Sequence, residues 1–123
     1  MLLRFVPRVL VFLLLPLTGC AADDGGPQWA AGMATVQESR LPAQARETLD
    51  LIDAGGPFPY EKDGSVFGNF ERRLPAHKRG YYHEYTVPTP GSRDRGARRI
   101  VTGQGDEIYY TDDHYDSFRA VLR

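Results

Sequence analysis

Residues 81–87 read YYHEYTV, a run of aromatic and β-branched side chains that is typical of a β-strand. Side chains alternate between the two faces of a strand, so Tyr82, Glu84 and Thr86 are expected on one face and the other four residues on the opposite face. Strand-like composition recurs, between turn formers, at residues 98–102, 107–110 and 118–122. These patterns predict a sheet of several strands in the C-terminal half of the chain.

One helix is predicted upstream of these strands, in the segment PAQARETLDLIDAGG that begins at residue 42. Proline is favoured at the first helical position, and the glycine pair at 55–56 ends the helix. The apolar stripe of this helix consists of Ala45, Leu49 and Ile52. One helix followed by several strands is an α+β pattern, so we expect an N-terminal helix packed on a twisted antiparallel sheet.

The composition limits the classes of protein to which the chain can belong. Of 123 residues, 41% are hydrophobic and 25% are charged, with a formal net charge of −1, which is typical of one small globular domain and excludes fibrous and strongly disordered chains. Past residue 19, twelve aromatic residues stand against thirteen Leu, Ile and Val. This mix favours a sheet with large rings in its core over a coiled coil, a helical repeat or a multi-span membrane protein.

Residues 1–19 have the pattern of a secretory signal peptide. Two arginines precede an apolar run at residues 9–15, and small residues follow. The run is too short to span a bilayer as a permanent helix. It leads into LTGC, which resembles a bacterial lipobox, in which the cysteine (here Cys20) is lipidated and becomes the first mature residue. An ordinary signal cut at Gly19 or Ala22 explains the same sequence, so we expect an exported protein, either extracellular or lipid-anchored on the outer face of the cell membrane.

Cys20 is the only cysteine, so the folded part is expected to hold together without an internal disulfide. Residues 20–35 are small, polar and glycine-rich, and we expect them to form a flexible tether that begins at the lipidated cysteine. The folded domain is then expected to occupy residues 36–123.

The charges are unevenly distributed. Residues 72–99 carry eight basic residues against two acids, whereas residues 104–116 carry five acids and no Lys or Arg. A basic region attracts polyanions, and arginine forks suit phosphate oxygens, so a phosphate-bearing ligand is a candidate. A solvated charged surface explains the same counts. The sequence has no His pair at metal-ligand spacing, no Walker loop and no Gly-x-Ser-x-Gly, so the chemistries that use them lack their usual markers.

The segment PGSRDRGARRI at residues 90–100 is a glycine-punctuated turn that leads into a predicted strand, and it would direct several guanidinium groups at one place. Glu84 precedes this segment and His114 follows it. A carboxylate, an imidazole and arginines in one cleft would provide the general acid–base chemistry that phosphoryl transfer needs.

Several segments together are similar to one family: GPFPY at 56–60, GYYHEYTVPTPGSRDRGARRIVTG at 80–103 and YYTDDHYDSF at 109–118. They closely resemble the small bacterial guanyl-specific ribonucleases, the family of barnase and Streptomyces ribonuclease Sa. The resemblance runs almost without gaps from about Val36 to Phe118. The family fold is an N-terminal helix on an antiparallel sheet, in agreement with the α+β pattern.

The resemblance implies an enzyme that cleaves single-stranded RNA on the 3′ side of guanosine without a metal or other cofactor, first forming a 2′,3′-cyclic phosphate and then hydrolysing it. It implies that Glu84 is the general base and His114 the general acid. Arg95 and Arg99 would then stabilise the negative charge of the transition state.

The implied substrate-binding residues are Phe67, Gly68, Asn69, Phe70, Glu71 and Tyr115. The Glu71 carboxylate would accept guanine N1–H and N2–H2, a donor pair that adenine lacks. The Phe67 ring would stack on the base, and backbone N–H groups of the next three residues would meet guanine O6 and N7. Tyr115 would lie near the phosphate.

Three positions depart from the family pattern. Phe70 stands where relatives have an arginine, which removes a charge beside the base and offers a second ring for stacking. Gly68 replaces a larger polar residue and is expected to make the loop more flexible. Gln37 stands where relatives have a disulfide cysteine, so about 2–4 kcal/mol of stabilisation is expected to be missing.

The alternative to an enzyme is a catalytically weak ribonuclease-fold module that binds guanine nucleotides or a protein partner. The presence of both Glu84 and His114 favours the enzyme, because a pure binder has no need of an acid and a base. The expected partner is single-stranded RNA, and contact with a membrane is expected only through a lipid on Cys20. A barstar-like inhibitor is expected by analogy if the enzyme reaches its own cytoplasm. A monomer is the default.

Overall fold

The computed structural model describes residues 26–123. The predicted signal peptide and Cys20 lie outside the described residues. The chain divides into two compact units, residues 1–31 and residues 32–123. Across the described residues, no helix has the length and the apolar character that crossing a membrane requires.

The described part of the first unit contains one turn of 3₁₀ helix, η2 (Gln28–Ala30), which Pro27 precedes. The predicted tether of residues 20–35 therefore includes a short element of regular structure. The domain boundary at residue 36 stays a prediction.

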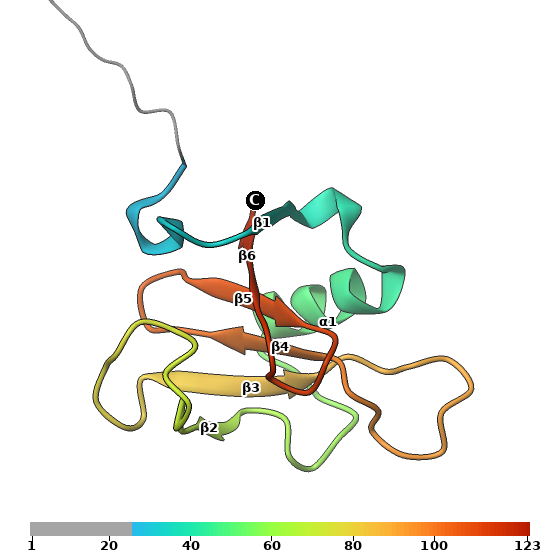
Figure 1. Cartoon of the computed structure of the whole chain (residues 1–123). Helices are drawn as coiled ribbons and strands as arrows, with labels where there is room; N and C mark the ends of the chain where they lie inside the picture. Colours follow the sequence, from blue (N-terminus) through green and yellow to red (C-terminus); the bar gives the residue numbers. More distant parts are fainter. Residues whose placement is uncertain (1–25) are drawn as a thin grey trace, which may run out of the picture. The chain divides into compact units, whose positions relative to one another are not determined.

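The second unit contains a six-stranded sheet in the order β1-β6-β5-β4-β3-β2 (Figure 1). Four of its five strand pairs are antiparallel, and β1 pairs with β6 in parallel. The strands are β1 (Thr35–Gln37), β2 (Ser65–Phe67), β3 (Tyr82–Thr86), β4 (Arg99–Thr102), β5 (Ile108–Thr111) and β6 (Arg119–Leu122). The predicted α+β fold is confirmed. The sequence patterns did not predict β1 with its parallel pairing, nor β2 as a strand.

The helix α1 (Ala43–Ala54) is where the apolar stripe predicted it. Pro42 is the N-cap residue, one position before the first helical residue at which it was expected. At the other end Gly55 has φ 80°, a left-handed conformation that glycine adopts without a Cβ penalty. The N–H of Gly55 then donates to the carbonyl of Ile52, which closes the last turn. A second 3₁₀ turn, η3 (Glu38–Arg40), lies between β1 and α1.

The core lies between α1 and one face of the sheet, and Tyr85 packs at its margin. The residues buried in it are Leu41, Ala45, Leu49, Val87, Ile100, Ile108, Tyr110 and Val121. Leu49 is fully buried, and burying a leucine side chain stabilises a fold by about 1.5–3 kcal/mol. Because α1 covers this face, the opposite face of β3 and β4 is left for other contacts.

Arg123, next to the end of β6, joins that strand to α1 and η3 through ion pairs. Its guanidinium bonds both carboxylate oxygens of Asp53, at 3.0 and 2.6 Å, and its Nε donates to Glu38 at 2.6 Å. The hydrogen bond from Arg123 lowers the pKa of Asp53. Exposed pairs of this kind contribute about 0.2–1 kcal/mol each, so they offset only part of what a disulfide here would supply.

Candidate active site

Glu84 and Arg99 lie on the sheet face opposite α1. In the β3–β4 register Thr86 pairs with Arg99, so Thr86, Arg99 and Glu84, two residues before Thr86, share one face. Their neighbours Tyr85 and Ile100 pack on the helix side. The predicted alternation is therefore confirmed at Glu84, Tyr85 and Thr86.

The carboxylate of Glu84 is the centre of a hydrogen-bonded cluster. Its Oε1 accepts hydrogen bonds from Arg95 Nη2 at 3.2 Å and from the Tyr115 hydroxyl at 2.7 Å, and Arg99 Nε lies 3.9 Å from the same oxygen. The Glu84 side chain is only 17% exposed, and electrostatic interactions are stronger there than in water. Burial, followed by the hydrogen bond to Glu84, raises the pKa of the Tyr115 phenol.

Arg99 is almost fully buried and is held by its own backbone surroundings. Its Nη1 donates to the carbonyls of Arg98 at 2.8 Å and Gly96 at 3.0 Å. Its Nε has no hydrogen-bond acceptor among the residues that the structure describes. A buried donor without an acceptor costs about 1–3 kcal/mol, and at 3.9 Å the Glu84 oxygen is an ion-pair partner of this N–H and not its hydrogen-bond acceptor. Arg95 is fixed beside it, because its Nε donates to Thr86 Oγ1 at 3.0 Å.

His114 and Tyr115 lie on the loop between β5 and β6. Both have positive φ angles, 58° and 74°, a conformation that costs a residue other than glycine about 1–3 kcal/mol. The His114 N–H donates to the carbonyl of Ala97 at 2.9 Å, which ties this loop to the arginine-bearing segment before β4. The rings of His114 and Tyr115 are 5.1 Å apart. Since Tyr115 also bonds Glu84, the predicted base and the predicted acid both lie next to the same tyrosine.

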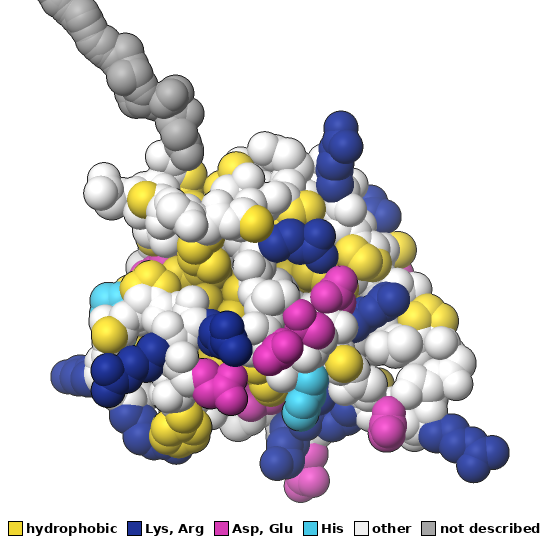
Figure 2. Space-filling model, in the orientation of Figure 1, with side chains coloured by type: hydrophobic (Ala, Val, Ile, Leu, Met, Phe, Trp, Pro, Cys, Tyr) yellow, Lys and Arg dark blue, Asp and Glu magenta, His cyan; other side chains and the backbone are white. Residues whose placement is uncertain are grey.

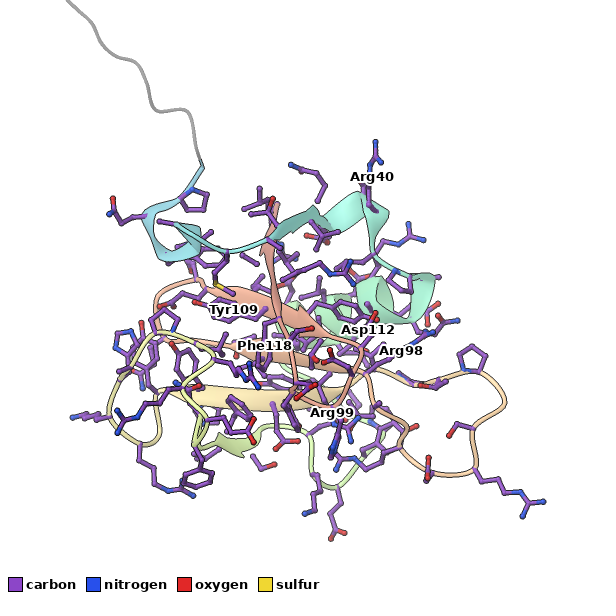
Figure 3. All side chains as sticks on the ribbon, in the orientation of Figure 1. Arg40, Arg98, Arg99, Tyr109, Asp112 and Phe118 are labelled. Atoms are coloured by element: carbon purple, nitrogen blue, oxygen red, sulfur yellow. The ribbon has the colours of Figure 1, made fainter. Side chains whose placement is uncertain are left out.

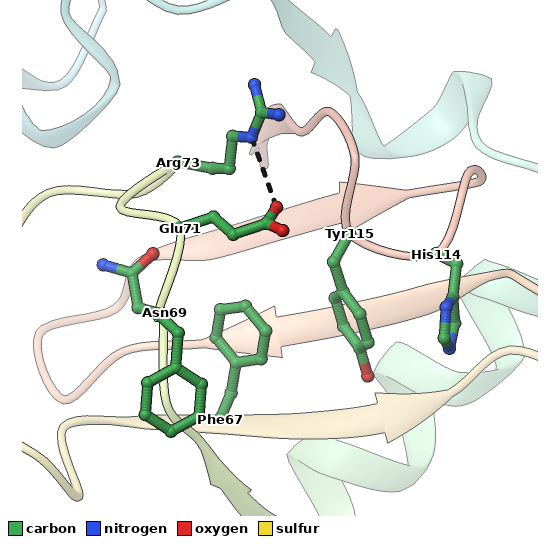
Figure 4. A pocket seen from close by; sticks show the side chains of 7 residues that line it. Phe67, Asn69, Glu71, Arg73, His114 and Tyr115 are labelled. Atoms are coloured by element: carbon green, nitrogen blue, oxygen red, sulfur yellow. Dashed lines mark ion pairs between the residues drawn. The ribbon is translucent and has the colours of Figure 1, made fainter.

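A hollow of about 220 Å³ opens beside this cluster (Figure 4). It is lined by Phe67, Asn69, Phe70, Glu71, Arg73, His114 and Tyr115. The Phe67 ring is 4.9 Å from the Tyr115 ring, and Tyr115 both lines the hollow and bonds the Glu84 carboxylate. At the end of the loop the Phe118 ring lies 5.9 Å from the Phe67 ring. It lies 6.4 Å from the ring of Tyr109, and both Phe118 and Tyr109 are labelled in Figure 3.

The loop after β2 is fixed by the side chain of Asn69. Asn69 has φ 54°, its Nδ2 donates to the carbonyl of Leu74 at 2.9 Å, and its Oδ1 accepts from the Leu74 N–H at 3.1 Å. Asn69 therefore uses its amide to hold the loop. Gly68 is the one predicted substrate-binding residue that does not line the hollow.

Phe70 lies over Gly68 and is 85% exposed. A Cβ at residue 68 would be 2.5 Å from the Phe70 ring, so a larger residue there would displace the ring. The guanidinium carbon of Arg79 lies over the same ring, 5.7 Å from its centroid. The position at which relatives were expected to carry an arginine thus holds an exposed ring with a cation beside it.

The charged groups at the rim of the hollow include one residue that the sequence patterns did not single out. Arg73 Nε is 3.7 Å from Glu71 (Figure 4), and Arg73 Nη2 is 3.7 Å from Asp116. Arg73 belongs to the basic run at residues 72–99, but nothing in its spacing distinguished it from the other arginines. Figure 2 shows Lys and Arg side chains with acidic side chains and a histidine among them, so the face that it shows is not uniformly positive.

Within residues 26–123, no group of three or more His, Cys, Asp and Glu side chains has the arrangement of a metal site.

The model of the ribonuclease family matches residues 26–122. The chain belongs to the ribonuclease family. It is 70% identical over 84 residues to guanyl-specific ribonuclease Sa3 of Kitasatospora aureofaciens, a match that covers 68% of this chain and 60% of Sa3. It is 53% identical over 92 residues to guanyl-specific ribonuclease St of Saccharopolyspora erythraea, covering 75% of this chain and 91% of St.

Solved structures support the same membership. Ribonuclease Sa2, determined in complexes with mononucleotides, superposes on this ribonuclease with a TM-score of 0.74 at 52% identity, covering 75% of this chain and 96% of Sa2. Sa2 has also been solved with a guanosine cyclophosphate, at a TM-score of 0.71 and 52% identity over 74% of this chain and 97% of Sa2.

Proposed function

We propose that this ribonuclease is an exported endoribonuclease that prefers guanosine and cleaves single-stranded RNA on its 3′ side, through a 2′,3′-cyclic phosphate and without a metal ion. The observation that carries the proposal is the set of contacts of Glu84. This carboxylate is bonded by Arg95 and Tyr115, lies next to buried Arg99, and adjoins the hollow that His114 lines. Similarity to proteins named guanyl-specific ribonucleases supports the base preference.

Two proton transfers account for the reaction. Glu84 takes the proton of the ribose 2′-OH, whose oxygen attacks the adjacent phosphorus, while protonated His114 gives a proton to the departing 5′-oxygen. A 2′,3′-cyclic phosphate and a free 5′-hydroxyl result. In the second step His114 takes a proton from water as the water attacks phosphorus, and Glu84 returns a proton to the 2′-oxygen, which leaves a 3′-phosphate on guanosine.

The arginines stabilise the charge that builds up on the phosphorus oxygens. Arg99 Nε has no acceptor among the described residues, so a phosphate oxygen would complete its hydrogen bonding. A phosphate oxygen would also take the Arg95 donor, which frees the Glu84 oxygen to act as a base. A fixed donor of this kind in a site shielded from water contributes about 10²–10³-fold in rate.

Guanine would occupy the hollow beside Tyr115. The Phe67 ring offers a stacking surface, and the Glu71 carboxylate accepts N1–H and N2–H2. The side chain of Asn69 fixes the loop, and the backbone N–H groups of residues 68–70 would donate to O6 and N7.

Glu71→Gln is expected to lower the preference for guanosine over adenosine by about 5–150-fold, the effect of losing 1–3 kcal/mol of discrimination. The glutamine side chain has one acceptor oxygen in place of two. Its NH2 group would face one of the two N–H donors of guanine, and two donors cannot form a hydrogen bond. The measurement is kcat/KM on single-stranded oligonucleotides that differ only in that base. Glu61→Gln, an exposed residue of a nearby turn, is the control and should leave the ratio unchanged. An unchanged ratio in Glu71→Gln would exclude this role.

The decisive experiment is cleavage of a single-stranded oligonucleotide that contains one guanosine, in the presence of EDTA. We expect a cut on the 3′ side of that base, an intermediate cyclic phosphate, and a bell-shaped pH profile, because the base must be unprotonated and the acid protonated. A folded protein that binds guanosine 3′-phosphate without cleaving RNA would instead support the alternative of a binding module.

Export is proposed from residues 1–20 alone. If Cys20 carries a lipid, Cys20→Ala is expected to move the protein from the membrane fraction to the medium in a bacterium that processes lipoproteins. The measurement is cell fractionation together with the mass of the mature N-terminus. A wild-type protein in the medium with an unmodified N-terminus would favour the ordinary signal cut. A barstar-like inhibitor and the monomeric state stay predictions.

A further inference from the structure

Asp113 directly precedes His114, yet its carboxylate faces its own loop. Asp113 Oδ1 accepts hydrogen bonds from Thr111 Oγ1 at 2.7 Å and from the Ser117 N–H at 2.9 Å, and Oδ2 accepts from Ser117 Oγ at 2.6 Å. The bond from Ser117 Oγ, with smaller contributions from the other two, lowers the pKa of Asp113 to about 2. This carboxylate therefore joins residues 111 and 117, on the two sides of His114 and Tyr115.

Thr111 extends these contacts to the backbone that carries the two functional rings. Its hydroxyl oxygen accepts hydrogen bonds from the Asp113 N–H at 3.3 Å and the Tyr115 N–H at 3.2 Å, while its proton goes to Asp113. Thr111 is the last residue of β5 and is buried, so it is a fixed point. The loop is thus bonded to the sheet through one hydroxyl and one carboxylate.

These bonds surround the two left-handed residues of the loop. His114 and Tyr115 have φ angles of 58° and 74°, and such a conformation persists only when the surrounding structure imposes it. Beyond the loop, the His114 N–H is fixed by Ala97. Without the Asp113 carboxylate, the segment from Thr111 to Ser117 would lose the bonds that join its two ends. The N–H bonds of His114 and Tyr115 would remain, but fewer contacts would then impose the positive φ angles of these two residues.

We propose that Asp113 is a positioning residue, whose hydrogen bonds to Thr111 and Ser117 hold the His114 imidazole and the Tyr115 hydroxyl at the phosphate. This inference rests on the proposed function, because it assigns those two groups to the reaction. The displacement of a catalytic group by about 1 Å can lower a rate by about 100-fold, so a loop residue that touches no substrate can still control kcat.

A second route by which Asp113 could act is the negative charge of its carboxylate, which would favour the protonated imidazole. The two routes differ in what the substitution Asp113→Asn would do. The asparagine side chain has one oxygen to accept from Thr111 Oγ1 and the Ser117 N–H, and its amide N–H can donate to Ser117 Oγ, so this substitution keeps the hydrogen bonds and removes the charge.

The experiment compares three substitutions in the full-length protein on a guanosine-containing dinucleotide. We expect Asp113→Ala to lower kcat by about tenfold or more. KM should change less than about threefold, because Phe67 at the end of β2 and Glu71 after it lie outside residues 111–117. Asp113→Asn should stay within about threefold of wild type. Asp112→Ala removes a neighbouring carboxylate that bonds Arg119 at 3.4 Å, and should leave kcat unchanged.

Two further measurements separate this inference from the proposed function. NMR couplings between the amide and α protons of residues 114 and 115 report their φ angles, and Asp113→Ala should shift them even if the wild-type protein cleaves no RNA. If Asp113→Ala does not fold, Thr111→Val, which keeps the shape and removes the hydroxyl, should lower kcat in the same way. A folded Asp113→Ala with wild-type kcat and couplings would overturn the proposal, and so would a loss in Asp113→Asn equal to that in Asp113→Ala.

Discussion

Glu84→Gln is expected to lower kcat for RNA cleavage by about 10²–10⁴-fold. The amide has almost the same shape as the carboxylate, and its oxygen can still accept the hydrogen bonds of Arg95 and Tyr115. It cannot take the proton of the 2′-OH, so the loss reports the missing base and not a missing contact. The measurement is kcat at saturating dinucleotide, at a temperature well below the unfolding midpoint of the variant.

The control for this substitution is Glu47→Gln. Glu47 is an exposed residue of α1, which packs on the opposite face of the sheet, so the same chemical change there should leave kcat unaltered. In the wild type, the rate should decrease at low pH, where the base is protonated. The rate of Glu84→Gln should not show this decrease. A Glu84→Gln variant with full activity would show that Glu84 is not the general base.

The strand pattern of residues 81–87 predicted on which face of β3 the Glu84 carboxylate lies. Successive side chains of a strand lie on opposite faces, and Tyr85 is the more apolar of the two, so Tyr85 was expected in the core and Glu84 on the other face. The β3–β4 register places Arg99 on the same face as Glu84. Gly55 ends α1 because its backbone adopts the left-handed conformation, which depends only on the residue type at that position. Such features depend on neighbours in sequence, and they could be predicted.

The edge strand β1 could not be predicted in the same way. It has three residues, TVQ, of which only Val36 is partly buried. Three residues are too few for an alternation of apolar and polar side chains to be recognised. Its partner β6 is more than eighty residues away, with Thr35 opposite Ala120, and its parallel direction depends on the path of the whole chain. Tertiary structure therefore determines this strand, not its own propensity.

The convergence of the site also depends on long-range geometry. The sequence pattern offered Glu84 and His114 as one hypothetical acid–base site, but it could not show that they converge, and only the resemblance to a family supported that. In the structure the link is Tyr115, whose ring lies beside His114 and whose hydroxyl bonds Glu84. Arg73 was missed because its position depends on the left-handed turn at Asn69 and Arg72, which composition does not reveal.

His114→Ala is expected to lower kcat for a dinucleotide by about 10²–10⁴-fold, but to have less than about a tenfold effect when the leaving group is p-nitrophenolate. A ribose 5′-oxygen is a poor leaving group unless it receives a proton as its bond to phosphorus breaks. Nitrophenolate departs as a stable anion and needs no acid. The measurement is the ratio of the two rates for a guanosine 3′-phosphate diester with each leaving group.

The same pair of substrates separates the acid from the base. Glu84→Gln should lower both rates, because the 2′-OH must lose its proton whatever leaves from the other side of phosphorus. His83→Ala, on the β3 face that Glu84 does not use, should change neither. Equal losses of His114→Ala on both substrates would mean that the imidazole acts on another part of the reaction, and its assignment as the acid would be wrong.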